Sequence, residues 1–264
     1  MSETTETKPY SVPPVERALR LLRYIGNGNK CRNLSKVSKE LGINRTTLIR
    51  LIHTLVDNRM IEEIAEGAGY RLGSGLISLA AQAIHGRDIV QISQPVLVEL
   101  TNSTGMSSHL GILDGAEIVY LAREAPNTHL ISNVQAGSRL PAHASSIGRA
   151  ILAELSTKEI ELMYDKKVLT AITDKTPLTT REILKQAVDD RAAGCAWSEG
   201  NFENGIGSCA AAILDHRGQT VGALNVSGPE NLFAAETRTG RTEIRHAVID
   251  AAKAVSKGLG FTES

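Results

Sequence analysis

The sequence predicts an α+β protein of two parts: a small basic N-terminal unit of helices and a larger unit of mixed strands and helices. Its 264 residues exceed the usual size of one domain, and 42% of them are hydrophobic, which excludes a wholly disordered chain. Helical and strand periodicities follow one another without a strict βαβ rhythm. Charge separates the parts, because residues 15–59 hold 10 Lys and Arg against 3 Asp and Glu in a chain of zero net charge.

The N-terminal part begins with a polar stretch, residues 1–10, which we expect to be a disordered tail. A helix is predicted from Pro14, and Gly26 to Asn29 end it. Its expected apolar stripe recurs at helical spacing and consists of Val15, Ala18, Leu19 and Leu22.

Two further helices follow, over residues 35–41 and after Asn44, which is a suitable N-cap. Gly42 separates them, so the spacing is typical of a helix-turn-helix. The third helix has an apolar face made of Leu48, Leu51, Ile52 and Leu55. Residues 61–65 and 70–72 then predict a small hairpin around the turn at residues 66–69, in the position of the wing of a winged helix.

This arrangement predicts binding to double-stranded DNA, since a recognition helix enters the major groove with a polar outer face. The side chains expected at bases and nearby phosphates are Arg45, Thr46, Thr47 and Arg50. Further basic side chains would contact the phosphate backbone, and they are Arg17, Lys36 and Arg71. Three signals agree on this interpretation: the local positive charge, the helix-turn-helix spacing and the hairpin.

The C-terminal part is predicted to follow a connecting helix at residues 76–85. A hairpin is expected at residues 110–122 around Asp114–Gly115, and a further strand at residues 130–134. Helices should begin at Ser145, at Ser156 and at Thr179, the last two with capping boxes. The remaining expected elements are strands 209–214 and 221–226 around a turn at 215–218, and a last helix over 244–255.

Several segments together resemble the IclR family of bacterial transcription regulators. They are residues 15–25 (VERALRLLRYI), 34–63 (LSKVSKELGINRTTLIRLIHTLVDNRMIEE), 70–73 (YRLG), 138–155 (SRLPAHASSIGRAILAEL), 205–213 (GIGSCAAAI) and 224–229 (LNVSGP). The resemblance covers roughly residues 12–260. It implies a winged helix-turn-helix over 11–74, a linker helix over 75–90 and a GAF-like α/β effector-binding domain over 91–260. It also implies dimers or tetramers that bind palindromic operators. We predict a ligand-responsive repressor of a catabolic operon that a small acid or aldehyde metabolite releases from DNA.

A small-molecule site is predicted at the helix that starts after Ser145, because the free amides of Ser146 and Ile147 form an anion site in its first turn. Asn225 and Ser227 lie two residues apart on a strand, so both side chains face one side. The resemblance implies effector contacts at Ser146, Ile147, Ser198, Ser208, Asn225 and Ser227.

The chain departs from the family pattern at three of these positions. Ser198 stands where Asp is frequent, Ser208 where Cys is frequent, and Asn225 where Ser is usual. Loss of the acidic residue favours an effector that ends in a carboxylate or a semialdehyde. Whether Trp197 and Cys209 line the same pocket is left open.

The alternative to a regulator is a hydrolase that uses Cys209, His143 and Asp215. No GxSxG motif surrounds a serine, and Cys209 lies in an apolar run that would make its thiol less acidic, so we expect no enzyme. The three cysteines form no CxxC motif, and neither a metal nor a cofactor is expected. The N-terminus is not a signal peptide and no apolar run spans a bilayer, so a cytoplasmic location is expected.

Overall fold

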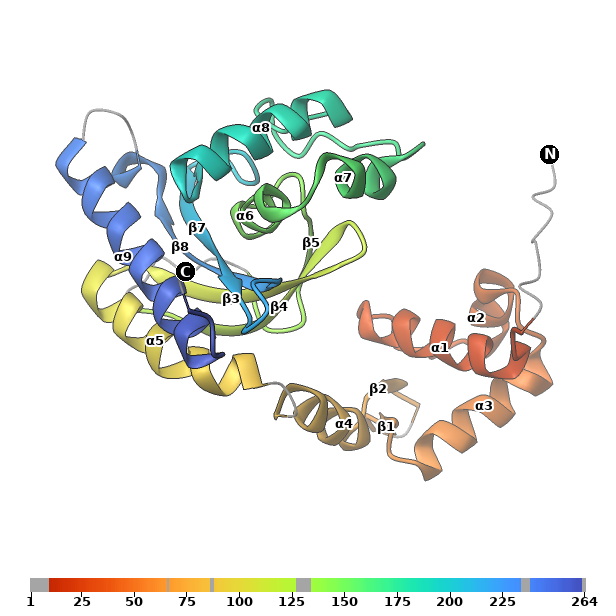
Figure 1. Cartoon of the computed structure of the whole chain (residues 1–264). Coiled ribbons are helices and arrows are strands. Elements are labelled where there is room, and N and C mark those ends of the chain that lie inside the picture. Colours follow the sequence, from red (N-terminus) through yellow and green to blue (C-terminus); the bar gives the residue numbers. More distant parts are fainter. Residues whose placement is uncertain (1–9, 66, 86–87, 127–133, 234–237, 263–264) are drawn as a thin grey trace. The chain divides into compact units, whose positions relative to one another are not determined.

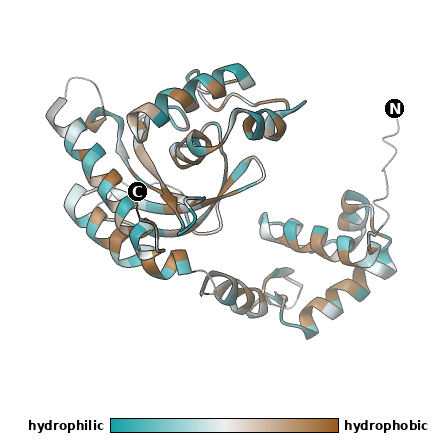
Figure 2. Ribbon diagram, in the orientation of Figure 1, coloured by the Kyte–Doolittle hydropathy of each residue, from teal (hydrophilic) through white to brown (hydrophobic). Residues whose placement is uncertain are grey.

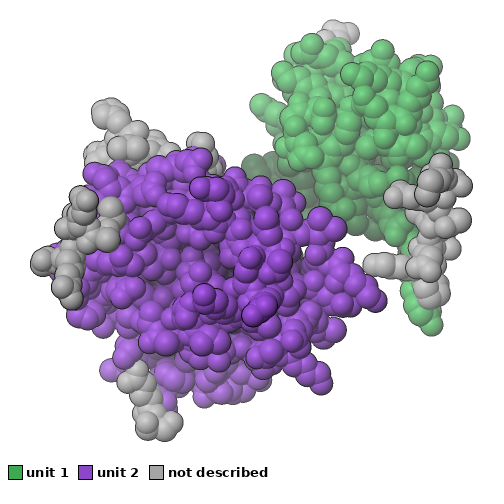
Figure 3. Space-filling view, turned by 90° about the horizontal axis from the view of Figure 1, so that it is seen from above, with its two compact units in different colours: residues 1–86 green, residues 87–264 purple. Residues whose placement is uncertain are grey.

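The computed structural model of the chain describes residues 10–65, 67–85, 88–126, 134–233 and 238–262. These residues form two compact units, Met1–Gly86 and Arg87–Ser264, which Figure 3 shows in green and purple. The expected tail at residues 1–10 lies outside the described residues apart from Tyr10, and so does most of the expected strand at 130–134. Within the described ranges, no helix is long and apolar enough to cross a membrane.

The N-terminal unit consists of helices α1 (Pro13–Gly26), α2 (Leu34–Leu41), α3 (Arg45–Asp57) and α4 (Ser74–His85) with a hairpin of β1 (Ile61–Glu63) and β2 (Tyr70–Leu72). Its core packs residues from all three of the first helices against the hairpin. The largest fully buried members are Leu21, Ile43, Leu48 and Ile61.

The turn between α2 and α3 forms as the sequence predicts. Gly42 takes the left-handed conformation with φ of 61° and closes α2. The Asn44 side chain then accepts a hydrogen bond from the Thr47 amide at 3.0 Å and caps α3. Local interactions therefore fix both the end of α2 and the start of α3.

The predicted apolar stripe of α1 is correct only in part, since Leu22 packs against the core and Ala18 is half-buried. Val15 and Leu19 are 54% and 44% exposed, whereas Leu21 and Ile25 are buried in the core. The helix carries apolar residues on two adjacent lines, and periodicity alone does not decide which line faces the domain. The packing of α1 onto α3 and the hairpin selects the Leu21 line.

The C-terminal unit is built on a six-stranded antiparallel sheet in the order β5-β4-β3-β8-β7-β6. The strands are β3 (Ser107–Asp114), β4 (Glu117–Glu124), β5 (Arg139–Pro141), β6 (Ala196–Glu199), β7 (Ile206–Leu214) and β8 (Thr220–Pro229). β3 and β8, which are distant in sequence, pair at the centre.

Helices cover both faces of this sheet (Figure 1). α5 (Asp88–Thr104) and α9 (Arg238–Gly258) lie side by side on one face, while α6 (Ser146–Glu154), α7 (Thr157–Tyr164) and α8 (Thr180–Ala193) cover the other. Hydrophobic and hydrophilic stretches alternate along these helices, as Figure 2 shows. Each face has its own core: Leu97, Leu224 and Val255 lie on the α5–α9 side, and Ile118, Ile147 and Ile160 on the α6 side.

The capping boxes at Ser156–Glu159 and Thr179–Glu182 are both present, and they confirm the predicted starts of α7 and α8. The sequence did not predict α5, β5 or β6. α5 escapes a periodicity search because Gln91, Gln94 and Pro95 interrupt its apolar line, and because two of its buried residues, Ser93 and Thr101, are polar. Thr101 Oγ1 is satisfied by Ser108 Oγ of the sheet, 2.8 Å away.

Candidate functional site

The outer face of α3 is polar and accessible, as predicted. Arg45, Thr46 and Arg50 are exposed and Thr47 is half-buried, while Leu48, Ile52 and Leu55 on the opposite face are buried. The Asn44 side chain occupies the Thr47 amide, and a phosphate oxygen can accept hydrogen bonds from the other first-turn amides of α3. This face therefore offers both side-chain and backbone donors.

The supporting basic residues differ in how available they are. Lys36 is exposed and only 3.7 Å from the Glu40 carboxylate, and Arg17 of α1 is half-buried. Arg71 on the hairpin donates to the Glu62 carboxylate at 2.6 Å. Arg71 must therefore exchange an internal partner for a phosphate, so its net contribution to DNA affinity should be smaller than that of Lys36.

The second candidate site is a small cavity between the start of α6 and the sheet, which we call the α6 cavity. Its volume is about 40 Å³, so a ligand of more than a few atoms requires neighbouring side chains to move. The residues that line it are His109, Tyr120, Val134, Leu140, Ser145, Ser146, Ser198, Phe202, Glu203, Ile206, Ser208, Asn225 and Ser227.

Strand pairing explains why polar residues gather there. Ser198 of β6, Ser208 of β7 and Ser227 of β8 are direct neighbours across three adjacent strands. Asn225 of β8 lies opposite His109 of β3. Since side chains of paired residues point to the same face of a sheet, one row of hydroxyls and one amide–imidazole pair face α6.

Asn225 connects the sheet to the helix start. Its Nδ2 donates to Ser146 Oγ at 3.2 Å, and its Oδ1 accepts from His109 Nδ1 at 3.0 Å. Burial lowers the pKa of His109 from 6.5 to about 4, because an imidazolium would lose its hydration there. His109 is therefore neutral at physiological pH, with its proton on Nδ1 and a lone pair on Nε2.

The structure brings together five of the six residues expected at the effector site: Ser146, Ser198, Ser208, Asn225 and Ser227. The Ile147 side chain instead packs in the core and is completely buried. Only its main-chain amide, in the first turn of α6, remains available for the predicted role. Trp197 and Cys209 do not line this cavity, because both side chains lie in the core on the α5–α9 face.

Sequence reasoning missed seven residues of the lining. They are His109, Tyr120, Val134, Leu140, Phe202, Glu203 and Ile206. His109 and Tyr120 sit edge to face with ring centroids 5.7 Å apart. Neither belongs to a motif, and only the pairing of β3 with β4 and β8 brings them beside the α6 start. Tyr120 lies inside the hairpin expected at residues 110–122, whereas His109 precedes that hairpin by one residue, so the sequence marks only Tyr120 as a strand residue.

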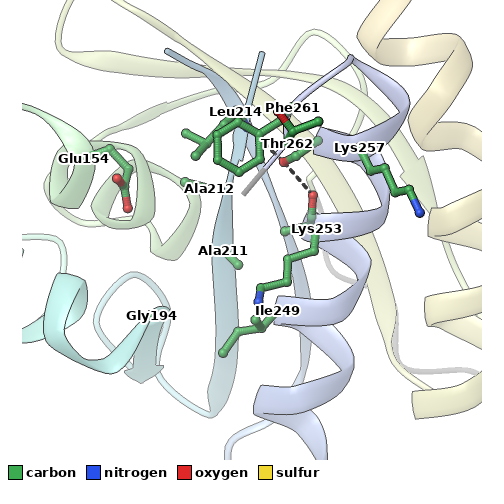
Figure 4. A pocket seen from close by; sticks show the side chains of 12 residues that line it. Glu154, Gly194, Ala211, Ala212, Leu214, Ile249, Lys253, Lys257, Phe261 and Thr262 are labelled. Carbon is green, nitrogen blue, oxygen red and sulfur yellow. Dashed lines mark hydrogen bonds between the residues drawn. The ribbon is translucent and has the colours of Figure 1, made fainter. Parts of the chain in front are cut away.

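A larger cavity of about 520 Å³ lies elsewhere, between α9, β7 and the C-terminal residues Phe261 and Thr262 (Figure 4). Small and apolar side chains such as Ala211, Ala212 and Ile249 form much of its wall. Specific ligand sites require several polar groups that converge on the ligand. The α6 cavity meets this requirement better in spite of its size, and it holds most of the residues that the sequence predicts.

The residues of the hydrolase alternative are in three different places. Cys209 is completely buried in the core beneath α9. His143 stacks edge to face on Tyr164, with ring centroids 5.9 Å apart, on the other side of the sheet. Asp215 accepts hydrogen bonds from the amides of Arg217 and Gln219 in the β7–β8 turn. These positions provide no nucleophile–base pair.

The neutral state of His109 predicts a specific loss of stability in acid. The unfolded chain binds a proton at His109 below about pH 6.5, but the folded chain does so only near pH 4. The stabilisation is complete above pH 6.5 and is lost as the pH falls, by about 2–3 kcal/mol between pH 7 and pH 4.5. Urea unfolding of the parent chain and of His109→Gln, at pH 7 and at pH 4.5, measures how much of this loss is due to His109.

The control for this experiment is His216→Gln, since His216 is exposed in the β7–β8 turn. We expect the control to keep the full acid dependence of the parent and His109→Gln to lose part of it. Identical acid dependence in all three proteins would contradict the assignment of a neutral buried His109.

The two parts of the chain, each of which holds one candidate site, match two domains of one protein family. Residues 14–65 match the sequence profile of the IclR helix-turn-helix domain, and residues 81–257 match that of the "Bacterial transcriptional regulator IclR C-terminal". The HTH-type transcriptional regulator XynR of Escherichia coli K12 is 31% identical over 252 residues, which cover 95% of this chain and 98% of XynR. The transcriptional repressor IclR of the same organism is 26% identical, with 94% and 90% coverage.

Solved structures agree with this result. A transcriptional regulator from Rhodococcus sp. RHA1 superposes with a TM-score of 0.81 at 28% identity, covering 94% of this chain and 98% of its own. An IclR homolog from Microbacterium hydrocarbonoxydans, in complex with 4-hydroxybenzoate, shares the fold with a TM-score of 0.78 at 20% identity, covering 93% of this chain and 98% of its own.

Proposed function

The chain belongs to the IclR family of bacterial transcriptional regulators, and from this premise we propose that it represses a catabolic operon until a small organic acid binds in the α6 cavity. Members of this family bind DNA through the helix-turn-helix and an effector through the C-terminal domain, and they are not enzymes. One observation carries the proposal: a single chain combines an exposed polar α3 face with a cavity rich in polar groups.

On the DNA side, α3 would lie in the major groove, with Arg50 at base edges and Arg45, Thr46 and Thr47 near the start of the helix. Lys36, Arg17 and Arg71 would contact phosphates. Two copies would read the two halves of a palindromic operator. The exposed apolar residues Ile77 and Leu79 of α4, 71% and 51% accessible, support self-association of the chain.

On the effector side, a carboxylate or semialdehyde group would accept hydrogen bonds from the first-turn amides of α6 and from the hydroxyls of Ser146, Ser208 and Ser227, with Asn225 beside them. The Ser198 hydroxyl donates to Asn201 Oδ1 at 3.0 Å and would have to give up this bond to join them. Two observations support an acid as the effector: the helix start itself, and 4-hydroxybenzoate bound by the Microbacterium relative. The effector would bind more tightly to a dimer arrangement that has low affinity for DNA, and it would thereby release the DNA. The coupling free energy between effector binding and DNA binding is typically about 1–3 kcal/mol.

Blocking the α6 cavity should abolish the response to the effector and leave DNA binding intact. Trp at position 146 is too large for about 40 Å³ of free space, so Ser146→Trp should still bind promoter DNA but no longer release it. Fluorescence anisotropy of labelled promoter DNA, titrated with a panel of small organic acids, measures the release. The matched control is Ser103→Trp on the exposed end of α5, which should respond as the parent does. If Ser146→Trp releases promoter DNA at the same acid concentrations as the parent, the effector binds elsewhere.

A further inference from the structure

Two cysteines, Cys195 and Cys209, lie side by side on the α5–α9 face of the sheet. Trp197 of β6 pairs with Cys209 of β7, and Cys195 precedes Trp197 by two residues, so both thiols point to the same face. Both side chains belong to the core on that face, and the Cys209 thiol donates a hydrogen bond to the Cys195 sulfur. Two thiols in contact can be oxidised together to a disulfide.

Cys195 lines a cavity at the edge of the sheet, whereas Cys209 is completely buried in the core. This cavity, which we call the β6 cavity, has a volume of about 410 Å³ and is bounded by α8, β6 and α9. Its lining includes the exposed residues Lys175, Asp189 and Ala193, so dissolved small molecules can enter it. Cys195 is therefore the thiol of the pair that an oxidant from solution meets first.

Two arginines of α9 bring positive charge to the β6 cavity. The guanidinium groups of Arg241 and Arg245 both lie over the Trp197 ring, 4.7 and 5.3 Å from its centre. Arg241 is also 3.3 Å from the Glu199 carboxylate. Arg245 has no acidic partner among the described residues, and its buried Nε has no hydrogen-bond partner there. Its charge is therefore available to stabilise an anion on Cys195, which lines the same cavity.

The surroundings of Cys195 favour its thiolate. The hydrogen bond from Cys209 is the main cause that lowers the pKa of Cys195 from 9.0 to about 7. The charges of Arg245 and Arg241 lower this pKa further, while burial and the Asp190 carboxylate of α8 oppose them. About half of the Cys195 side chains are then thiolates at pH 7, and the thiolate is the form that peroxides oxidise.

The backbone at Cys195 leaves room for the two sulfurs to join. Residues diagonal to one another on a sheet lie farther apart than a disulfide spans, so Cys195 has to move toward Cys209. The pairing of β6 with β7 begins at Ala196, and strand hydrogen bonds therefore do not hold Cys195. Gly194, just before it, ends α8 in the left-handed conformation with φ of 69°.

We propose that Cys195 and Cys209 form a reversible oxidation site, in which hydrogen peroxide reacts with Cys195 and Cys209 then closes a disulfide. The Cys195 thiolate attacks one peroxide oxygen, so an S–O bond forms and the O–O bond breaks. Hydroxide leaves and becomes water with the proton that Cys195 had lost. The Cys209 sulfur then attacks the sulfenic acid, an S–S bond forms, and the oxygen leaves as water with the Cys209 proton.

Cys31 of the N-terminal unit is a matched control within the same chain. It is 5% exposed and Cys195 is 3% exposed, so exposure does not distinguish the two thiols. Burial raises the pKa of Cys31 to about 11, and the Glu40 carboxylate adds to this effect. The N-terminal unit holds no second cysteine. Cys31 should therefore resist the oxidant that Cys195 meets.

The test treats the full chain with hydrogen peroxide at pH 7, blocks the remaining thiols under denaturing conditions, and measures the cysteine peptides by mass spectrometry. We expect a Cys195–Cys209 disulfide that dithiothreitol reduces. Cys195 should be oxidised at least about 100-fold faster than Cys31, because its larger thiolate fraction outweighs the lower nucleophilicity of a more acidic thiol.

Two pairs of variants separate the roles of the neighbours. Cys209→Ala should stop at a sulfenic acid on Cys195, which dimedone traps, whereas Cys195→Ala should leave Cys209 reduced. Arg245→Gln should slow the oxidation of Cys195, because it removes a charge that stabilises the thiolate. The control Arg181→Gln removes the same charge from an exposed position on α8 and should be oxidised at the rate of the parent.

Three results in the parent chain would overturn the proposal. They are oxidation of Cys31 as fast as Cys195, a disulfide that joins two chains instead of Cys195 to Cys209, and a Cys195 that stays reduced at peroxide concentrations that oxidise free cysteine. These measurements use neither DNA nor effector, so they are independent of the proposed regulatory function.

Discussion

Asp190→Ala should destabilise the C-terminal unit by about 3–5 kcal/mol, the largest effect we expect from a single substitution on stability. The Asp190 carboxylate of α8 accepts two hydrogen bonds from Arg149 of α6, at 2.7 and 2.9 Å, and both side chains are only 5% exposed. Gln186 donates to the same carboxylate at 3.1 Å. Without Asp190, the Arg149 guanidinium is left buried with its charge uncompensated.

The pair also has a functional position, since Arg149 lies one turn after Ser145 and Ser146 in α6. It holds the helix start that faces the α6 cavity against α8. Denaturant unfolding followed by the fluorescence of Trp197, the single tryptophan of the chain, reports on this unit. The double variant Arg149→Met/Asp190→Leu should recover most of the loss, because it removes both charges.

An exposed ion pair provides the matched control. Asp114→Ala removes one of the two partners of Arg139, whose side chain is 44% exposed, and should cost less than about 1 kcal/mol. If Asp114→Ala and Asp190→Ala lower the free energy of unfolding by similar amounts, burial is not the reason that the Arg149–Asp190 pair matters. A double variant as unstable as Asp190→Ala would show that the charges are not the cause.

Arg50→Ala should weaken binding to the chain's own promoter about 5–150-fold, which corresponds to about 1–3 kcal/mol for one base contact. Arg50 is exposed at the middle of the outer face of α3, and the rest of that turn packs inward through Leu48 and Ile52. Folding should not change, since the side chain covers no core residue. Gel-shift titration with the promoter and with a scrambled duplex measures affinity and specificity together.

The control is Arg181→Ala, an exposed arginine on α8 in the other unit. It removes the same charge from the chain but from a surface with no expected DNA contact, and it should bind as the parent does. Loss of affinity for promoter and scrambled DNA by the same factor would reassign Arg50 from base to phosphate contact. Unchanged affinity would remove it from the interface.

Local signals predicted most of the N-terminal unit. Asn44 as a cap, Gly42 as a left-handed stop and the buried line of Leu48, Ile52 and Leu55 each act within a few residues, so their consequences can be derived from the sequence. The capping boxes of α7 and α8 belong to the same class. The phase of α1 is different, because its buried line is chosen by partners outside the helix.

The α6 cavity could be predicted only in part, for a related reason. Ser146 belongs to a helix start, and Asn225 and Ser227 alternate on a strand, so the sequence marks them. His109 and Tyr120 become part of the site only through the pairing of β3 with β4 and β8, over a separation of 116 residues between His109 and Asn225. No periodicity records that register, and the hydrogen bond between His109 and Asn225 follows from it.

The measurement that tests the account most directly is the salt dependence of promoter binding by the parent chain. If α3 and its basic neighbours occupy DNA as proposed, the logarithm of the association constant should fall linearly and steeply with the logarithm of salt concentration, with a slope of about −0.9 for each phosphate contacted. Saturating effector should lower the affinity at every salt concentration. Promoter affinity that is independent of salt, or no binding even at low salt, would contradict the central claim that this chain acts through a cationic helix on duplex DNA.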